Sequence, residues 1–226
     1  MSGGAGHDRT GASDGAPARG VVVDPERAEI RGSPEAIRAF LVGGDEPDPP
    51  LLAAGLRAAR APLARFRVSG LKEPLEALVD GHAAVLVLPA GGGETALRAC
   101  TPSGLLGLLV RAVGLCPRPR AAGGPVVVDV ARMARIVTER TAADAGLDER
   151  DEERLQAHLD ALAGHWRIEG HAPGIGWYLE VLDSELGLWT VEDRPEKHLT
   201  LTPTDATAVL DELAALPGHV GLGPQA

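Results

Sequence analysis

The residue types that could do chemistry in this chain are scattered, and we find no complete metal-binding set among them. His158, His165 and His171 are spaced seven and six residues apart. A helix that binds zinc through two histidines places them about four residues apart, and no cysteine lies near these three to complete a set of ligands. We therefore predict no metal site.

Nucleophile and phosphate chemistry also lack their usual sequence context. Ser103 and Ser184 stand outside any Gly-x-Ser-x-Gly sequence, which holds the nucleophile of many hydrolases. The glycines 91–93 follow an apolar run, but no Gly-Lys-Ser/Thr of a phosphate-binding loop comes after them. Asp183 and Glu185 lie in a tight-turn sequence, which we expect to leave both carboxylates in water. The sequence predicts no catalytic residue and no bound cofactor.

The aromatic residues favour binding over catalysis. Three of the six are tryptophans, at 166, 177 and 189, in the second half of the chain. Core packing is the default explanation for these residues, and the alternative is that one or two of them form a partner-binding patch, because exposed Trp and Tyr side chains are common anchors of protein–protein interfaces. Trp177 is the strongest candidate because it follows the irregular loop 173–176. The candidate partner-binding residues are Trp177, Tyr178, Leu186 and Trp189.

Charge and composition narrow the class of partner. The net charge of −10 argues against nucleic acid, because phosphate binding needs a basic surface. Residues 144–160 hold seven acids and two arginines, so this stretch is either a solvated helix face or a docking surface for a basic partner. Only two of the 22 basic residues are lysines, which together with abundant Ala, Gly and Pro is typical of a GC-rich, actinobacterial genome.

Cysteines and apolar stretches indicate a cytoplasmic protein. Cys100 and Cys116 do not make a disulfide framework, and we interpret both as small buried thiols. The apolar stretch 105–113 is too short to cross a bilayer, and no secretory leader pattern is present. We expect no membrane insertion.

The elements that carry these residues repeat once along the chain. Residues Phe66-Arg67-Val68-Ser69-Gly70 return as Trp166-Arg167-Ile168-Glu169-Gly170. After each copy come two extended runs and then a helix opened by proline: 85–88, 97–100 and Pro102 in the first copy, and 178–182, 199–202 and Pro203 in the second. Alternation of apolar and polar residues marks strands with one wet face, as in antiparallel sheets. We predict an α+β fold with a mostly antiparallel sheet, built from two quasi-symmetric strand–strand–strand–helix repeats and flanked by helices.

The expected organisation is one compact domain with two lobes. Residues 1–19 are almost without apolar side chains and predict a disordered tail. Residues 20–120 form the first repeat lobe with its N-terminal helices, and residues 121–226 form the second. The boundary falls in 118–125, which is rich in Pro, Gly and Arg. Within the first lobe, residues 74–79 predict a short helical turn.

Taken together, these features resemble the EspG family of ESX (type VII) secretion-associated proteins. The resemblance rests on the segments 65–114 and 165–217, on Leu-Val-Arg-Ala-Val-Gly-Leu-Cys-Pro-Arg-Pro at 109–119, and on Tyr-Leu-Glu-Val-Leu-Asp at 178–183. It implies a central antiparallel sheet with quasi-two-fold symmetry. It also implies a cytosolic chaperone that keeps helical secretion substrates soluble through surface contacts and needs no catalytic group.

Three functions therefore stay open at this point. The first is a non-enzymatic, chaperone-like binding protein for a secreted helical partner, as the resemblance implies. The second is an immunity or regulatory protein whose acidic segment 144–160 docks a basic partner. The third is a small-molecule enzyme with a pocket between the repeats.

Overall fold

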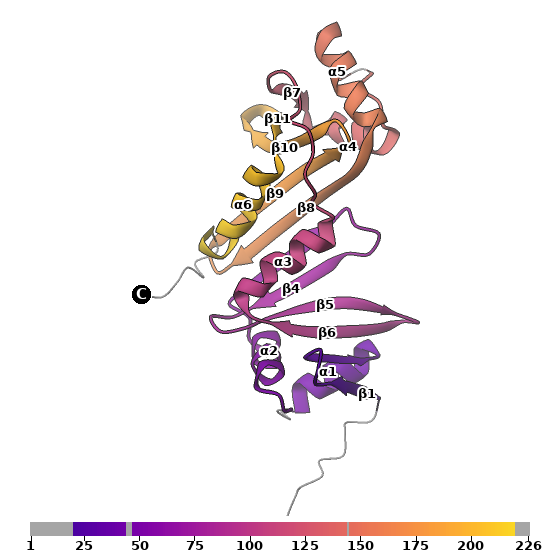
Figure 1. Ribbon diagram of the computed structural model, residues 1–226. Coiled ribbons are helices and arrows are strands. Elements are labelled where there is room, and N and C mark those ends of the chain that lie inside the picture. The colour runs from indigo at the N-terminus through magenta and orange to yellow at the C-terminus, as the bar shows by residue number, and fades with distance from the viewer. Residues whose placement is uncertain (1–19, 44–46, 144, 220–226) are drawn as a thin grey trace, which may run out of the picture.

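A single antiparallel sheet runs through the molecule. The computed structural model describes residues 20–43, 47–143 and 145–219, and these residues form eleven strands and six α-helices. The strand order is β1-β2-β6-β5-β4-β3-β8-β9-β10-β11-β7 (Figure 1), and neighbouring strands are antiparallel throughout. The predicted α+β class with a mostly antiparallel sheet is confirmed. The predicted tail, residues 1–19, lies outside the described residues.

Six strands and three helices make up the first half of the chain. They are β1 (Val21–Asp24), β2 (Glu29–Gly32), α1 (Pro34–Gly43), α2 (Pro50–Arg60), β3 (Ala64–Ser69), β4 (Leu75–Val79), β5 (Ala84–Gly91), β6 (Glu94–Cys100) and α3 (Pro102–Val113). The second half has five strands, three α-helices and one turn of 3-10 helix. They are β7 (Val126–Asp129), α4 (Val130–Glu139), α5 (Glu149–Asp160), β8 (Leu162–Ala172), β9 (Ile175–Ser184), β10 (Gly187–Arg194), η1 (Pro195–Lys197), β11 (His198–Thr204) and α6 (Ala206–His219).

The two halves meet in the middle of the sheet, where β3 pairs with β8. Val68 lies opposite Ile168, so the central residues of the two similar pentapeptides face each other, as equivalent residues do across a two-fold axis. Gly70, which ends the first pentapeptide, has a φ of +83°, and a Cβ there would lie 2.0 Å from the His165 carbonyl oxygen. The position therefore requires glycine.

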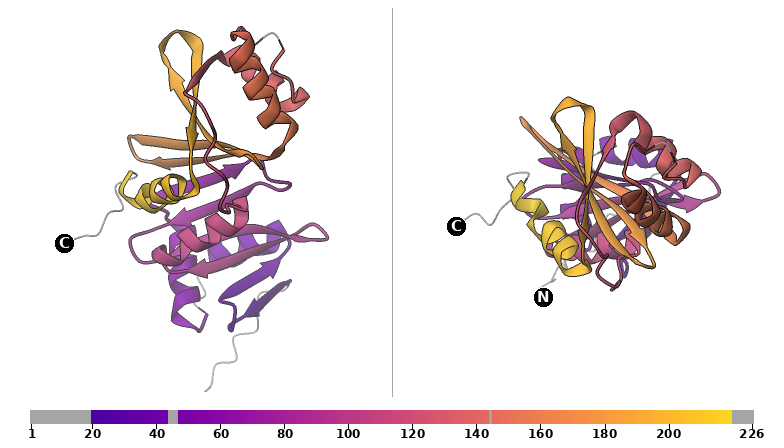
Figure 2. Two further views of the ribbon diagram at one scale, coloured as in Figure 1. Left: turned by 45° about the horizontal axis from the view of Figure 1, so that its top comes forward. Right: turned by 90° about the horizontal axis from the view of Figure 1, so that it is seen from above.

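Outside this pair, the strands follow in the same order in both directions (Figure 2). β4, β5 and β6 lie beyond β3, and β9, β10 and β11 lie beyond β8. The registers match as well: Ala84 pairs with Cys100 in the first half, and Leu188 pairs with Thr204 in the second. Each residue of the second pair lies 104 positions after its counterpart in the first pair. The duplication remains our proposal, and these registers support it.

The helices that follow the two hairpins begin alike. The Thr101 side chain accepts the Gly104 N–H at the start of α3, and the Asp205 carboxylate accepts the Ala208 N–H at the start of α6. Such caps satisfy a backbone donor that the first turn of a helix leaves free, and each contributes about 1 kcal/mol. The side-chain caps thus fix where both helices leave the sheet.

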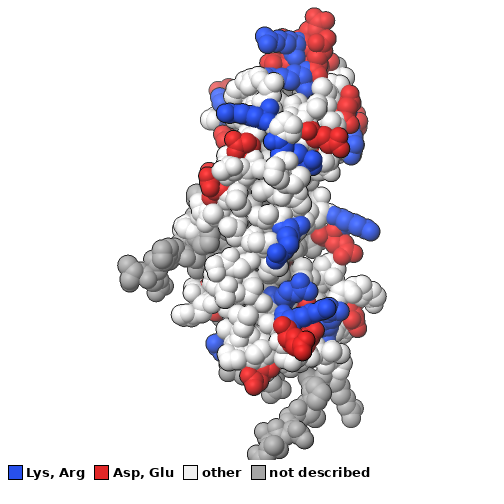
Figure 3. Space-filling model, in the orientation of Figure 1, with Lys and Arg blue, Asp and Glu red and all other residues white. Residues whose placement is uncertain are grey.

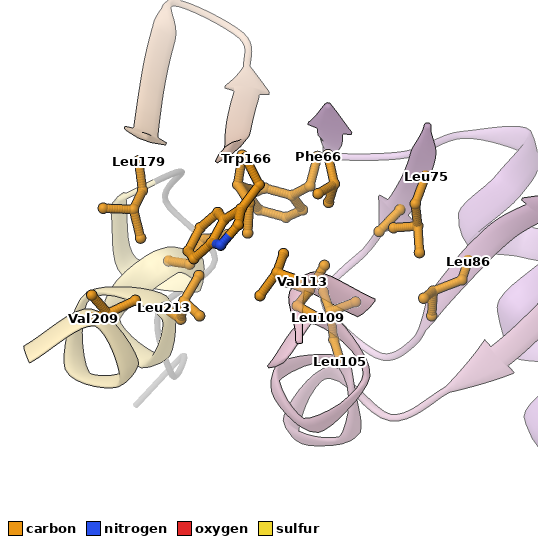
Figure 4. Packing of buried hydrophobic residues seen from close by; sticks show 14 of the residues in the cluster. Phe66, Leu75, Leu86, Leu105, Leu109, Val113, Trp166, Leu179, Val209 and Leu213 are labelled. Atoms are coloured by element: carbon orange, nitrogen blue, oxygen red, sulfur yellow. The ribbon is translucent and has the colours of Figure 1, made fainter. Parts of the chain in front are cut away.

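Helices cover both faces of the sheet and enclose three apolar clusters. On one face α3 and α6 lie over the middle strands, and Leu109 and Leu213 pack there against Phe66 and Trp166 (Figure 4). On the other face α1 and α2 cover the outer part of the first half, and α4 and α5 cover the outer part of the second. Each fully buried Leu or Ile contributes about 1.5–3 kcal/mol relative to exposure.

Residues 74–79 are where the sequence prediction is wrong. Instead of a helical turn, Leu75–Val79 is strand β4, paired on both edges with β3 and β5. Leu75 and Ala77 face α3, whereas Leu78 faces the cluster under α1 and α2. With both faces buried, the strand shows no apolar–polar alternation. Each half therefore carries four consecutive strands before its helix, one more than the predicted unit.

Candidate functional site

The four candidate partner-binding residues do not form one patch. Trp189 is fully buried in the cluster beneath α4 and α5, so it presents no surface to a partner. Trp177 is half-buried and packs on the side of the sheet that α3 and α6 cover. Leu186 is 47 % exposed in the turn between β9 and β10. Trp177 and Leu186 remain candidates at two separate places.

Tyr178 lies on the opposite face from Trp177 and is held by its own chain. The Arg167 guanidinium stands 4.3 Å from the centre of the Tyr178 ring, and the phenol oxygen accepts the Asp193 N–H at 2.7 Å. Burial raises the pKa of the Tyr178 phenol above its usual value, so the group stays neutral at physiological pH. Tyr178 is a fixed part of the sheet surface.

Around Tyr178 the middle strands carry an ordered charge network. Arg167 forms ion pairs with Glu169 at 2.9 Å and with Glu180 at 3.1 Å, and His165 Nε2 lies 2.8 Å from the Glu180 carboxylate. Burial alone would raise the pKa of Glu180, but the hydrogen bond from His165 and the charge of Arg167 outweigh it and hold that pKa below its usual value. This part of the sheet face is polar and preorganised.

A hollow with mostly apolar walls lies beside this network, at the base of the β5–β6 hairpin. Beyond the pairs Glu76–Val87 and Gly32–Thr95, residues 88–94 of this hairpin pair only with each other, so the hairpin projects from the sheet (Figure 1). The hollow has a volume of about 490 Å³. Its lining residues, which we call the finger hollow, are Arg67, Pro74, Leu75, Glu76, Val87, Leu88, Pro89, Gly93, Glu94 and Thr95.

Arg67 gives the finger hollow a cationic group. Its side chain is exposed, and no ion pair among the described residues involves it. Two acids, Glu76 and Glu94, also line the hollow, so the walls combine apolar side chains with both signs of charge. Such a surface suits the side chains of another protein better than it suits a reactive substrate.

A second hollow lies in the other half and uses some of the matching positions. It has a volume of about 550 Å³ and lies between β9, β10, β11 and α6. Leu179 and Val191 stand where the register places Leu75 and Val87 in the first half. We call this the threonine hollow, and its lining residues are Tyr178, Leu179, Thr190, Val191, Glu192, Asp193, Thr204, Ala208 and Glu212.

A third hollow is an apolar groove between α3 and α6. It has a volume of about 230 Å³ and is walled by Leu105, Leu106 and Leu109 of α3 and by Leu213 and Leu216 of α6. Figure 3 shows that the surface over these two helices is largely uncharged, whereas the end of the molecule that carries α5 displays acidic and basic side chains.

Charge divides unequally between the halves. Residues 20–120 contain 12 basic and 11 acidic residues, a balance of +1. Residues 121–226 contain 8 basic and 19 acidic residues, a balance of −11. The whole negative charge of the chain therefore belongs to the second half, although only part of it lies in α5.

The closest approach to a catalytic arrangement is a buried pair, His158 and Ser184. His158 Nδ1 lies 2.7 Å from Ser184 Oγ, but Ser184 donates its only proton to the Gly187 carbonyl and accepts the Leu186 N–H. A hydroxyl has one proton to give, so with that proton on the Gly187 carbonyl, Nδ1 of His158 is the donor in their bond. A histidine that donates to serine cannot take its proton, and the pair holds the β9–β10 turn.

Other reactive types are engaged in structure as well. Asp183, which we expected in water, is buried and forms an ion pair with Arg118 at 2.8 Å. Burial raises the pKa of the Cys100 thiol to about 11, which makes it a poor nucleophile. Within the described residues, no three His, Cys, Asp or Glu side chains are placed to share a metal ion. The helices of this part of the chain are also too short or too polar to span a bilayer.

Little in the amino-acid sequence indicates the finger hollow. Leu75 and Glu76 of β4, which was predicted as a helical turn, line it together with residues of β3, β5 and β6. The one available signal was the run Gly91-Gly92-Gly93 between two extended segments, which is typical of a hairpin turn.

Comparison with known proteins gives one kind of match. No protein-family model matches the chain, and no curated protein matches it. Among solved structures, the chain is similar to the Mycobacterium tuberculosis type VII secretion system chaperone EspG5, solved in complex with the PE25–PPE41 dimer. The TM-score is 0.51 at 14% sequence identity, over 90% of this chain and 91% of that one. At this identity the likeness establishes the fold.

Proposed function

We propose that the chain is a chaperone-like binding protein for helical substrates of a type VII (ESX) secretion system, and that it acts in the cytoplasm. The observation that carries the proposal is the fold match to a secretion chaperone, because it extends over nearly the whole of both chains. A binding role also fits a surface of hollows in which the reactive side chains are already engaged in structure.

The finger hollow is the surface we assign to the partner. It is larger than the apolar groove between α3 and α6, and the exposed Arg67 lines it. A helix that inserts apolar side chains into such a hollow would bury apolar area and pair its acids with the free guanidinium. Trp177, Tyr178 and Leu186 stay as further candidates on the second half.

Purification of the tagged full chain from its native host tests the proposal. We expect a stoichiometric helical partner that is exported by the secretion system and that stays in the cytoplasm, aggregated or degraded, when the chain is absent. Thr95→Arg should fill the hollow and lower partner recovery at least tenfold. Val42→Arg is the matched control, because Val42 is 83 % exposed and lies on α1, away from the hollow.

Two outcomes would overturn the proposal in different ways. Recovery of the chain alone with a bound metabolite would support the small-molecule enzyme. A partner that resists Thr95→Arg but is lost on Glu149→Lys with Glu153→Lys would point to the acidic helix instead.

That second outcome corresponds to the alternative function, an immunity or regulatory protein that docks a basic partner. The specific observation in its favour is the balance of −11 in residues 121–226. Long-range attraction would speed the encounter with a basic protein and make binding sensitive to salt. Binding that weakens steeply between low and high salt favours this alternative, whereas contact through an apolar hollow is much less sensitive to salt.

A further inference from the structure

The linker that joins the two halves is anchored on the second half at three points. Arg118 forms the ion pair with buried Asp183. Ala121 is buried against Gly187, whose φ is +142° and where a Cβ would lie 2.6 Å from the Ala121 nitrogen. The Ala122 carbonyl accepts a hydrogen bond from Arg154 of α5 at 3.3 Å. The linker therefore depends on the β9–β10 turn and on α5 together.

His158 ties those two elements to each other. It extends from α5, and its Nδ1–H donates to Ser184 in the β9–β10 turn. Its ring meets the Trp189 ring edge-on, with centroids 5.1 Å apart. Arg154 lies over the same tryptophan at 5.2 Å. The buried His158 imidazole thus contacts the β9–β10 turn and Trp189 of the core. Arg154, which lies over the same tryptophan, also bonds to the linker.

Protonation would place a second cation in this interior. His158 is 7 % exposed, so its charged form would lose most of its hydration. On its own helix it faces Arg154, which pairs with Asp151 at 2.8 Å. On the turn, Asp183 is already neutralised by Arg118, and Glu185 is exposed to water. No free carboxylate among these groups is available to stabilise an imidazolium.

We propose that His158, Ser184, Trp189 and Arg154 form an acid-sensitive latch that holds α5 and the linker 118–122 on the second half and releases them when His158 is protonated. The latch is independent of the partner assigned above. Burial, and then the charge of Arg154, lower the pKa of His158, which agrees in direction with this geometry.

The lowered pKa of His158 determines how the stability of the latch depends on pH. The native state prefers neutral His158, so its contribution is complete above a pH of about 6.5, the pKa of an unfolded histidine, and is lost as the pH falls below that. Buried Glu29 and Glu180 have lowered pKa values, so their contributions are lost only below a pH of about 4.5. The range between these values separates the effect of His158 from those of the two carboxylates.

Hydrogen exchange of the full chain at pH 7.5, 6.5 and 5.5, corrected for intrinsic rates, tests the latch. One proton taken up on opening raises the opening constant by up to about tenfold per pH unit. We expect the amides of α5 to lose up to about tenfold in protection between pH 6.5 and 5.5, and those of β3 and β8 to stay constant. His158→Asn keeps a donor near the Nδ1 position without titrating, so it should abolish the loss, whereas exposed His82→Asn should not.

Two results would overturn the latch. One is unchanged protection of α5 in the wild-type chain across this range, and the other is an equal loss in His158→Asn. If His158→Asn does not fold, titration of the wild-type His158 imidazole by NMR decides the matter. A value at or above 6.5 contradicts the latch, and a value clearly below it, together with the wild-type exchange loss, supports it.

Discussion

In the first half of the sheet, the hollow beside the outer hairpin is walled by Leu75, Val87 and Leu88; in the second half, the matching positions hold Leu179, Val191 and Glu192. The registers that position these residues correspond, and the side-chain caps of the following helices correspond as well. What changes is the surface: a balance of +1 over residues 20–120 against −11 over residues 121–226. The two halves therefore share a backbone arrangement but differ in surface charge. Which partner each half could bind depends on that surface and not on the backbone.

The largest expected difference between the halves lies in their cores. Val85 and Trp189 occupy matching positions on β5 and β10, and both are fully buried. Trp189→Ala should lower the free energy of unfolding by about 3–5 kcal/mol, because it leaves a large cavity under α5. Val85→Ala should cost about 2 kcal/mol. Urea denaturation measures both, and equal losses would mean that the second core does not depend on its tryptophan.

Gly70 tests the pairing that joins the halves. Gly70→Ala combines a φ of +83° with a Cβ 2.0 Å from the His165 carbonyl oxygen, so we expect a loss of about 2–4 kcal/mol. Gly91→Ala is the matched control, since its φ is +79° but its Cβ would meet nothing within 4 Å, and it should cost only about 1 kcal/mol. Thermal unfolding of the two variants distinguishes collision from backbone strain alone.

Glu29 in the first half and Glu180 in the second are buried carboxylates among cationic groups, and both should respond to acid. Glu29 lies between Arg31 and Arg98, and Glu180 lies between His165 and Arg167. Their lowered pKa values mean that the contribution of each is present above a pH of about 4.5 and is lost as the pH falls.

Glu29→Gln and Glu180→Gln should therefore each reduce the difference in unfolding free energy between pH 7 and pH 4 by about 1 kcal/mol. Urea denaturation at the two pH values measures that difference. A variant that unfolds with the pH dependence of the wild-type chain would show that its carboxylate is not held by its neighbours.

The smallest effect is expected at the first turns of α1 and α5. Glu35 and Glu149 are exposed acids near the positive ends of these helices, where a negative charge contributes about 0.3–1 kcal/mol. Glu35→Lys and Glu149→Lys should both cost less than about 1 kcal/mol, and high salt should reduce the cost. Equal stability losses with unequal effects on partner binding would assign the partner to one half.

Local patterns were enough to predict much of the fold. Alternation in residues 65–68 and 166–169 predicted the two central strands, and Pro102 predicted the start of α3. Strand β4 could not be predicted in this way, because Leu, Glu and Ala favour helix and the strand is buried on both faces. Only its pairing with β3 and β5 makes it a strand.

The surroundings of the candidate site residues were harder to predict from the sequence than the strands and helices. Trp189 looked like an exposed anchor because nothing near it in the sequence shows that α5 covers it. Asp183 looked solvated because its partner, Arg118, is 65 residues away. Burial and ion pairing of this kind depend on contacts between distant segments, and these appear only when the chain is folded.

The direct pairing of β3 with β8 also determines how the molecule can move. Five consecutive residue pairs, from Arg65–His171 to Ser69–Arg167, join the halves through backbone bonds, so there is no flexible joint between them. A continuous sheet of this kind can twist, but it resists bending between the two halves. The distance between the finger hollow and the threonine hollow then changes little, so a partner that contacts both must have contact groups at a matching distance.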